Sequence, residues 1–233
     1  MKFKLPLTSV ATVLGSSILS LLVLNLAAVW MQYLIEDPRP VFQFFIRLFD
    51  FNQEGNIPSF FSSLLLLTAS LLLFLIYGFE REAGNKSLGW LGLALVFVFL
   101  SLDEATQIHE FFIGYFRINF GLSGYFYYAW IIPYGVAVGI LGLVYIPFFK
   151  RLDQSMFLTM AVSGAVFLSG AIGMEMFGGN TMDNEGFGLR YMLFYTMEET
   201  LEKSGVSLFI WSLLRFLSRR KKKVSLKLAP IAG

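Results

Sequence analysis

Six long runs of mostly apolar residues constrain this chain more than any other feature. An α-helix rises 1.5 Å per residue, so about 20 apolar residues cross the roughly 30 Å of bilayer hydrocarbon. The runs cover residues 10–35, 57–79, 88–114, 125–149, 156–177 and 189–217. With 56% hydrophobic residues and 26 Phe among 233 residues, the composition is that of a membrane protein. We therefore predict an all-α, polytopic membrane helical bundle of about six transmembrane helices, a single domain over residues 1–233.

The positions of the charged residues predict an orientation in the membrane. If the N-terminus is cytoplasmic, thirteen of the 18 Lys and Arg residues fall in cytoplasmic segments, as the positive-inside rule requires. Both termini are then cytoplasmic. Thirteen of the 16 Asp and Glu residues fall in the opposite half, which should attract cations. The first run is longer than the roughly 7–15 apolar residues of a signal peptide, so we expect an uncleaved anchor.

Two shorter segments interact with the bilayer surface in this prediction. Between the first two runs, Phe42, Phe45, Ile46 and Phe49 recur with the spacing of an amphipathic helix, which favours a short interfacial helix. Residues 218–233 form a basic cytoplasmic tail, and its run of Arg and Lys at 219–223 favours contact with anionic lipid headgroups. We expect the lipid bilayer as partner and no nucleic acid. The sequence leaves the oligomeric state and any partner subunit open.

Ionisable residues gather near one level of the otherwise apolar chain. They are Asp103, Glu104, His109, Glu110, Glu175, Glu198, Glu199 and Glu202. A last helix that began after Glu202 would be too short to span, so the helix must begin near Leu189 and carry its three acids toward mid-membrane. Each such acid costs about 2–3 kcal/mol, which partners must offset. We expect Lys203, bound protons, a cation or a water-filled cavity to do so.

The spacing on the third run predicts a shared site. At 100° per residue, Asp103, Thr106, Gln107 and Glu110 lie on one helix face. We predict that Asp103, Glu110, Glu198 and Glu202 surround one cavity with His109 at its rim. Glu54 and Asn56 fall at the outer mouth of the second helix, either as a solvated turn or as part of this site.

The candidate ligands and bases point to two kinds of chemistry. One His among many carboxylates suits a hard or borderline cation, so Asp103, His109, Glu110, Glu198 and Glu202 are the candidate metal ligands for Mg²⁺, Mn²⁺, Ca²⁺ or Zn²⁺. Glu104 and Glu199 are the candidate catalytic bases. We expect no haem and no nucleotide. The absence of Cys excludes a thiolate metal site and a cysteine nucleophile.

Segments rich in small residues predict a loop and a helix contact. Residues 178–186, rich in Gly and acids, predict a loop that is either plain or a mobile lid. Gly135 and Gly139 on the fourth run, and Ala161, Ala165, Ser169 and Gly173 on the fifth, predict close packing of these two helices.

Three functions remain open at the level of the sequence. The first is a membrane enzyme, metal-dependent or not, that acts on a lipid-like substrate at the acidic site. The second is a structural or assembly subunit whose acids are held by internal bonds. The third is a proton or cation transporter. An open site favours the enzyme and a sealed network favours the subunit. Transport lacks a polar path through the cytoplasmic half of the helices.

Overall fold

The structure is a computed structural model that describes residues 6–35 and 39–219. None of these residues forms a strand, which confirms the all-α prediction. In chain order the helices are α1 (Leu7–Leu34), α2 (Pro40–Phe49), α3 (Ile57–Glu82), α4 (Leu88–Thr106), α5 (Ile108–Phe120), the short η1 (Gly124–Phe126), α6 (Ile131–Phe149), α7 (Gln154–Leu168), the π-helical η2 (Ser169–Met174), α8 (Glu175–Glu185) and α9 (Leu189–Arg219). The predicted basic tail lies largely outside the described residues.

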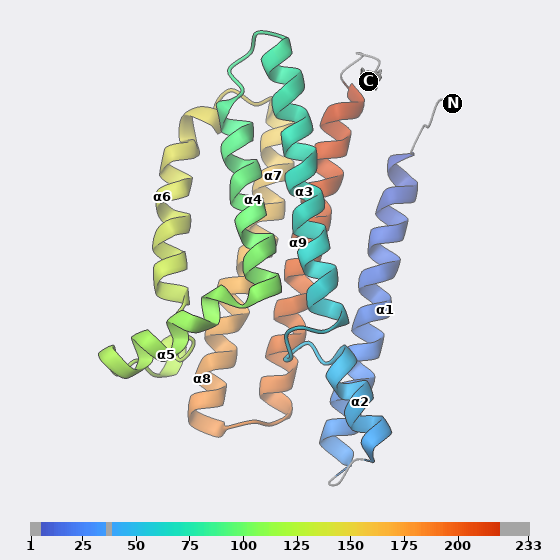
Figure 1. Ribbon diagram of the computed structural model, residues 1–233, viewed down its shortest axis with the longest axis vertical. Helices are drawn as coiled ribbons and strands as arrows, with labels where there is room; N and C mark the ends of the chain where they lie inside the picture. The colour runs from blue at the N-terminus through green and yellow to red at the C-terminus, as the bar shows by residue number, and fades with distance from the viewer. Residues whose placement is uncertain (1–5, 36–38, 220–233) are drawn as a thin grey trace, which may run out of the picture.

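Five helical stretches are long and apolar enough to cross a membrane. They are α1, α3, α4, α6 and the continuous stretch Gln154–Glu185 that contains α7, η2 and α8. With 31 residues, α9 has the length to span, but acidic side chains interrupt its apolar surface. The first turn of α1 and the last turn of α9 lie at the same end of the bundle (Figure 1). α2 and α5 lie at or near the opposite end.

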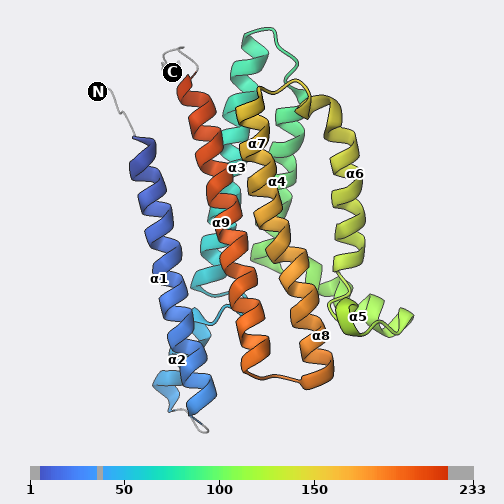
Figure 2. The same cartoon turned by 180° about the vertical axis from the view of Figure 1, so that it is seen from behind.

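The packed centre of the molecule is formed by α3, α4, α7 and α9 (Figures 1 and 2). Its buried side chains include Leu73 of α3, Leu93 of α4, Met160 of α7 and Leu213 of α9. α1 flanks this centre on one side and α6 on the other. A second cluster joins α1 and α9 through Leu21, Val29 and Tyr195. This arrangement leaves one face of α1 and most of α6 exposed, as expected of helices that face lipid.

The third predicted helix does not continue to residue 114. Gln107 adopts a left-handed backbone with φ of 60°, which ends α4 and starts α5 in a new direction (Figure 1). The Asp103 carboxylate accepts a 2.8 Å hydrogen bond from the backbone N–H of His109, so it satisfies a free donor in the first turn of α5. The prediction that Asp103 and Glu110 share one continuous helix face was therefore wrong.

Two further segments differ from the sequence prediction. Residues 178–186, predicted as a loop or lid, are helical as far as Glu185. The fourth helix begins at Ile131 and not near residue 125, because η1 and a turn occupy the residues before it. The short helix predicted between the first two runs is present as α2, Pro40–Phe49.

Two glycines bring α9 very close to its neighbours. A Cβ on Gly170 would lie 2.6 Å from the backbone oxygen of Glu198, and a Cβ on Gly205 would lie 2.6 Å from the backbone nitrogen of Phe167. Only glycine fits at these contacts. A Cβ on Gly135 or Gly139 of α6 would instead meet nothing within 4 Å. Close helix packing is thus found between α9 and the adjoining α7 and η2, and not between the fourth and fifth predicted helices.

Candidate functional site

His109, at the start of α5, lies between two carboxylates. Its Nδ1 is 3.4 Å from Oδ1 of Asp103 and its Nε2 is 3.2 Å from Oε1 of Glu54. Burial lowers the pKa of His109, but the hydrogen bonds to Asp103 and Glu54 outweigh it and raise this pKa to about 10. At neutral pH the ring is therefore a cation that donates from both nitrogens. A metal ion could bind His109 only by replacing one of these carboxylates.

The turn that carries Glu54 is held by a buried polar core. The Asn25 amide donates to Oγ1 of Thr196 at 2.9 Å, and its Oδ1 accepts from the backbone N–H of Phe51 at 2.8 Å. Nearby, Gln32 donates to the buried Asp50 carboxylate at 2.8 Å. These bonds tie α1, the 50–56 turn and α9 together. They fix the position from which Glu54 reaches His109.

A second set of contacts links α6, α8 and α9. The Trp130 indole donates to Oε1 of Glu175 at 3.0 Å, and its ring lies edge-on to His109 at 5.2 Å between centroids. The Glu175 and Glu198 carboxyl groups lie close enough to interact with one another. The α8 and α9 acids are therefore joined to the His109 side through Trp130.

The third set centres on Lys203, whose side chain is fully buried in α9. It forms an ion pair with Glu199, one helical turn away, and its Nζ lies 4.7 Å from the centre of the Phe51 ring. Glu104 of α4 interacts electrostatically with Glu199, Lys203 and His109. We call the ionisable groups of these three sets the acidic layer: Glu54, Asp103, Glu104, His109, Glu175, Glu198, Glu199, Glu202 and Lys203.

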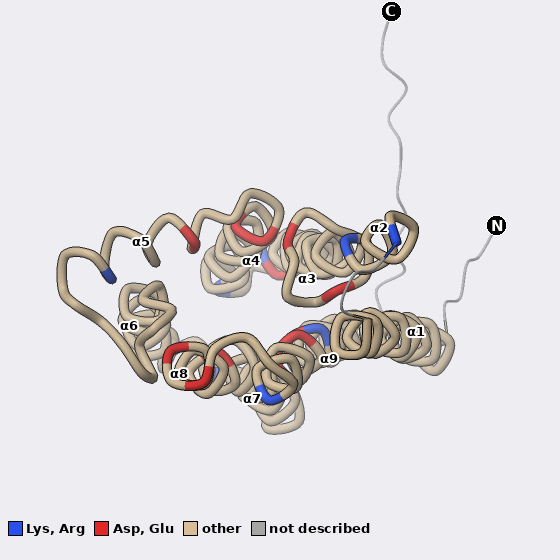
Figure 3. The backbone as a smooth tube through the Cα atoms, turned by 90° about the horizontal axis from the view of Figure 1, so that it is seen from below, with Lys and Arg blue, Asp and Glu red and all other residues tan. Residues whose placement is uncertain are grey.

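The acidic layer contains most of the residues predicted for the site. Glu202 interacts electrostatically with Glu199 and Glu104, so acids of α4 and α9 do act on one another. Glu110 is exposed on α5 and stands apart, with only electrostatic interactions to Glu54 and His109. Acidic positions occur around several helices in the view from the α2 and α5 end (Figure 3).

Several members of the layer were missed or left undecided by the sequence. Lys203 was named as a possible partner, and its spacing of four residues from Glu199 is a recognisable ion-pair signal. The sequence left two positions open for Glu54, a solvated turn or the site, and its contact with His109 favours the site. The role of Trp130, which contacts the layer, was not predicted, since an indole near a helix end usually anchors the helix at the membrane surface.

Exposure distinguishes five carboxyl groups of the layer from the buried Lys203 and Asp103. Glu104, Glu175, Glu198, Glu199 and Glu202 are all only half-buried, whereas Lys203 is 1% exposed. These side chains are thus less enclosed than Lys203, which supports Glu199 from within the bundle.

An apolar cavity of about 450 Å³ lies in the same bundle. Its walls include Phe97 and Leu100 of α4, Phe157 and Gly164 of α7, and Gly205 and Phe209 of α9. Leu100 precedes Glu104 by four residues and Gly205 follows Glu202 by three, so the cavity begins about one helical turn from the acidic layer. We call it the apolar cavity.

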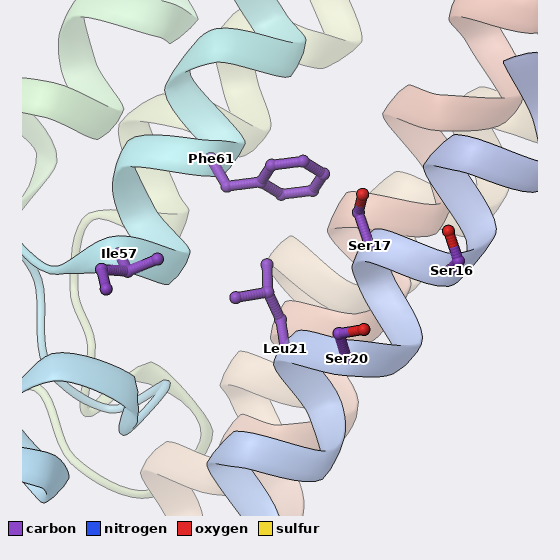
Figure 4. A pocket seen from close by; sticks show the side chains of 6 residues that line it. All are labelled: Ser16, Ser17, Ser20, Leu21, Ile57 and Phe61. Carbon is purple, nitrogen blue, oxygen red and sulfur yellow. The ribbon is translucent and has the colours of Figure 1, made fainter.

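A second hollow, of about 320 Å³, lies between α1 and α3 (Figure 4). It is lined by Ser16, Ser17, Ser20, Leu21, Ile57 and Phe61. Hydroxyl and apolar groups suit helix packing, and this lining holds no ionisable side chain. The candidate chemistry therefore belongs to the acidic layer.

Possible metal ligands do not gather at one point of the described structure. Within residues 6–35 and 39–219, no three His, Asp or Glu side chains converge in the way that holds a metal ion. The predicted ligand set of Asp103, His109, Glu110, Glu198 and Glu202 stays a prediction.

The comparison with known families matches almost the whole bundle. The model of a domain of unknown function, DUF8692, matches residues 17–217. The chain belongs to the DUF8692 family. The match runs from within α1 to near the end of α9, so every residue of the acidic layer lies inside the DUF8692 domain. No curated protein and no solved structure matches the chain.

Proposed function

We propose that this DUF8692 protein is an integral membrane enzyme that acts on a lipid-like substrate at the acidic layer. The observation that carries the proposal is that five carboxyl groups of the layer are half-buried and that two of them, Glu104 and Glu202, lie about one turn from an apolar cavity. A sealed structural network would need neither accessible acids nor adjoining apolar space. A lipid-like substrate needs both, since it has a polar and an apolar part.

The topology belongs to the same proposal. With α9 as the sixth span, α1 begins and α9 ends on the cytoplasmic side, together with the basic loops 83–87 and 150–153. The acidic layer then lies toward the opposite side of the membrane. α9 reaches the required length only if its acids lie within the bundle, and the ion pair of Lys203 with Glu199 offsets part of their cost.

Glu104 and Glu199 are the proposed acid–base pair. They belong to different helices, interact with one another and are both half-buried. One would take a proton from the substrate and the other would donate one. Lys203 holds Glu199 in position through their ion pair, and His109 lies close enough to Glu104 to influence its charge.

A divalent cation is a second form of the same proposal. Mg²⁺, Mn²⁺, Ca²⁺ or Zn²⁺ would bind carboxylates of the layer, among them Glu202, whose side chain lies at the close contact of Gly170 in η2. The cation would polarise the polar part of the substrate. Its binding would require side chains to move, because three ligands do not converge in the described part of the chain.

A structural subunit is the competing function, and the bonding of the bases favours it. His109 and Lys203 are both already paired with carboxylates inside the bundle. A transporter is less well supported, because the space beyond the layer is lined mainly by Leu, Phe, Ala and Gly and offers ions few polar groups.

The test compares membrane lipids from cells that produce the wild type, Glu104→Gln, Glu199→Gln or Glu185→Gln. Glu185 is the control because its carboxylate is exposed and pairs with Arg190. We expect the wild type and the control to change the abundance of the same lipid species. Loss of an acid–base group should reduce that conversion by about 100-fold or more.

The same preparations separate the two forms of the proposal. Purified wild-type protein that contains a stoichiometric divalent metal, lost in Glu198→Gln, would support the metal-dependent form. Conversion without bound metal would support acid–base catalysis alone. Lipid profiles that are identical in all four strains would contradict an enzyme and favour the structural subunit.

A further inference from the structure

The apolar cavity has the size of a binding site. Its volume of about 450 Å³ lies within the roughly 300–1,000 Å³ typical of small-molecule sites. A core is normally packed with few voids larger than a water molecule. The lining is almost wholly apolar, with Ser163 as its one hydroxyl, and the Ser163 Oγ donates to the Met160 backbone oxygen. The cavity therefore suits hydrocarbon and not water.

The surroundings of the cavity determine which hydrocarbon can reach it. It is enclosed by helices that are long and apolar enough to cross a membrane, among them α3, α4 and α7. α6 contacts α4 at one end, where Tyr145 donates to the Gly89 backbone oxygen at 3.0 Å. At its other end, Trp130 contacts His109.

Between its ends, α6 is loosely packed. Val136, Ile140 and Val144 are exposed, and a Cβ on Gly139 would meet no atom within 4 Å. A chain in the bilayer can therefore approach the cavity from the side, past the middle of α6.

The acidic layer, next to the cavity, determines which charge a bound molecule can carry at its polar end. Eight Asp and Glu residues meet there if Glu110 is included, against two bases, His109 and Lys203. Both bases are already engaged: His109 lies near Asp103 and Glu54, and Lys203 pairs with Glu199. Within the described ranges, Glu175, Glu198 and Glu202 form no ion pair with a Lys or Arg. The surplus is negative and complements a cation.

We propose that the apolar cavity holds the hydrocarbon chain of a membrane amphiphile whose cationic head group lies against Glu198 and Glu202. The spacing supports the pairing, since Glu202 lies one helical turn from Gly205 in the cavity wall. This proposal rests on the proposed function only in calling the amphiphile a substrate. Binding itself requires no turnover.

Gly164 allows the cavity to be filled without a predictable clash. It lines the cavity, and a Cβ there would meet no atom within 4 Å, whereas a Cβ on Gly205 would collide with the Phe167 backbone. Gly164→Leu therefore extends into the cavity. Gly15→Leu is the matched control, because Gly15 of α1 has equally free space and lies outside the cavity lining. Ala165→Leu, also in the lining, is a second filling variant should Gly164→Leu fail to fold.

The experiment labels the full chain, in phosphatidylcholine nanodiscs, with photoactivatable probes. Each probe has the same long alkyl chain with a diazirine at its middle, and its head group is an amine, an N-acetyl amide or a carboxylate. We expect the amine probe to label peptides of α4, α7 and α9 that line the cavity. Gly164→Leu or Ala165→Leu should reduce this labelling by about tenfold or more, and Gly15→Leu should leave it unchanged.

The head group is tested separately. The wild type should be labelled most by the amine probe and least by the carboxylate probe, and the double variant Glu198→Gln and Glu202→Gln should lose this order while its cavity is still labelled. Equal labelling of wild type and both filling variants would overturn the cavity as the chain site. A preference for the carboxylate, or none, would overturn the cationic head group.

These outcomes are distinct from those of the proposed function. Cavity labelling together with unchanged cellular lipids would support this binding site and refute the enzyme. Lipid conversion that persists in Gly164→Leu and Ala165→Leu, together with no labelling of the cavity in the wild type, would support an enzyme. The same result would overturn the binding site proposed here.

Discussion

Lys203 is the residue on which the acidic layer most depends. It is fully buried, pairs with Glu199 and lies over the Phe51 ring. Removing one partner of a buried ion pair leaves the other charge uncompensated, which typically costs about 3–5 kcal/mol. We expect Lys203→Met to cost about 3 kcal/mol, the lower end of that range, because the Glu199 side chain keeps 20% of its exposure. The melting temperature in detergent measures this loss.

Two comparisons make that prediction specific to the buried pair. The double variant Lys203→Met with Glu199→Gln should recover most of the loss, since replacing both members of a buried pair is often close to neutral. Arg190→Gln removes an exposed pair with Glu185, worth about 0–1 kcal/mol. A Lys203→Met variant that melts like Arg190→Gln would show that Lys203 does not stabilise the layer.

At the scale of the elements, the joint between α4 and α5 contributes most to building the site. Asp103 accepts from the His109 backbone and also lies beside its ring, so one carboxylate both ends α4 and holds α5. The His109 pKa in the folded protein is about 10, above its ordinary value of 6.5. A raised pKa stabilises the fold fully below the unfolded value, and this stabilisation is lost as pH rises through the folded value.

This linkage predicts how the joint responds to pH. The difference in melting temperature between wild type and His109→Gln should be largest below about pH 6.5 and should shrink as the pH rises to about 10. The subtraction removes the titration of groups that both proteins share. A difference that stays constant over this range would mean that His109 is not held as a cation by Asp103 and Glu54.

The elements also show what sequence patterns could and could not predict. Apolar length located α1 and α3 closely, together with the start of α4 and the end of α6, because hydrocarbon thickness sets the length of a span. It could not locate the end of α4, since Gln107 is not a residue type that usually adopts positive φ. It also failed for residues 178–186, where glycines that suggest a loop instead permit close contacts, as Gly179 has with Tyr127 and Tyr128.

For the site, the sequence identified most of the acidic residues, but it did not predict the hydrogen bonds and ion pairs that connect them. Their common depth was predicted from the need of α9 to span, and Glu104, Glu199 and Glu202 of α4 and α9 interact with one another. The buried core of Asn25, Asp50 and Thr196 could not be predicted, because its members are far apart in the chain and meet only after folding. The same holds for the bond from Trp130 to Glu175.

At the scale of the whole molecule, the central claim is that the acidic layer is an open site facing away from the cytoplasm. The chain has no Cys, so single cysteines can report on this directly. Glu202→Cys places a thiol in the layer, Lys86→Cys marks the loop between α3 and α4, and Ser212→Cys marks a buried position in α9.

The decisive measurement is the reaction of these three variants with a small, charged, membrane-impermeant thiol reagent added to intact cells. We predict that Glu202→Cys reacts, that Lys86→Cys reacts only after the membrane is permeabilised, and that Ser212→Cys does not react. A thiol at position 202 that stays unreactive before and after permeabilisation would mean a sealed network. Reaction at position 86 in intact cells, with position 202 protected, would place the acidic layer on the cytoplasmic side and contradict the account.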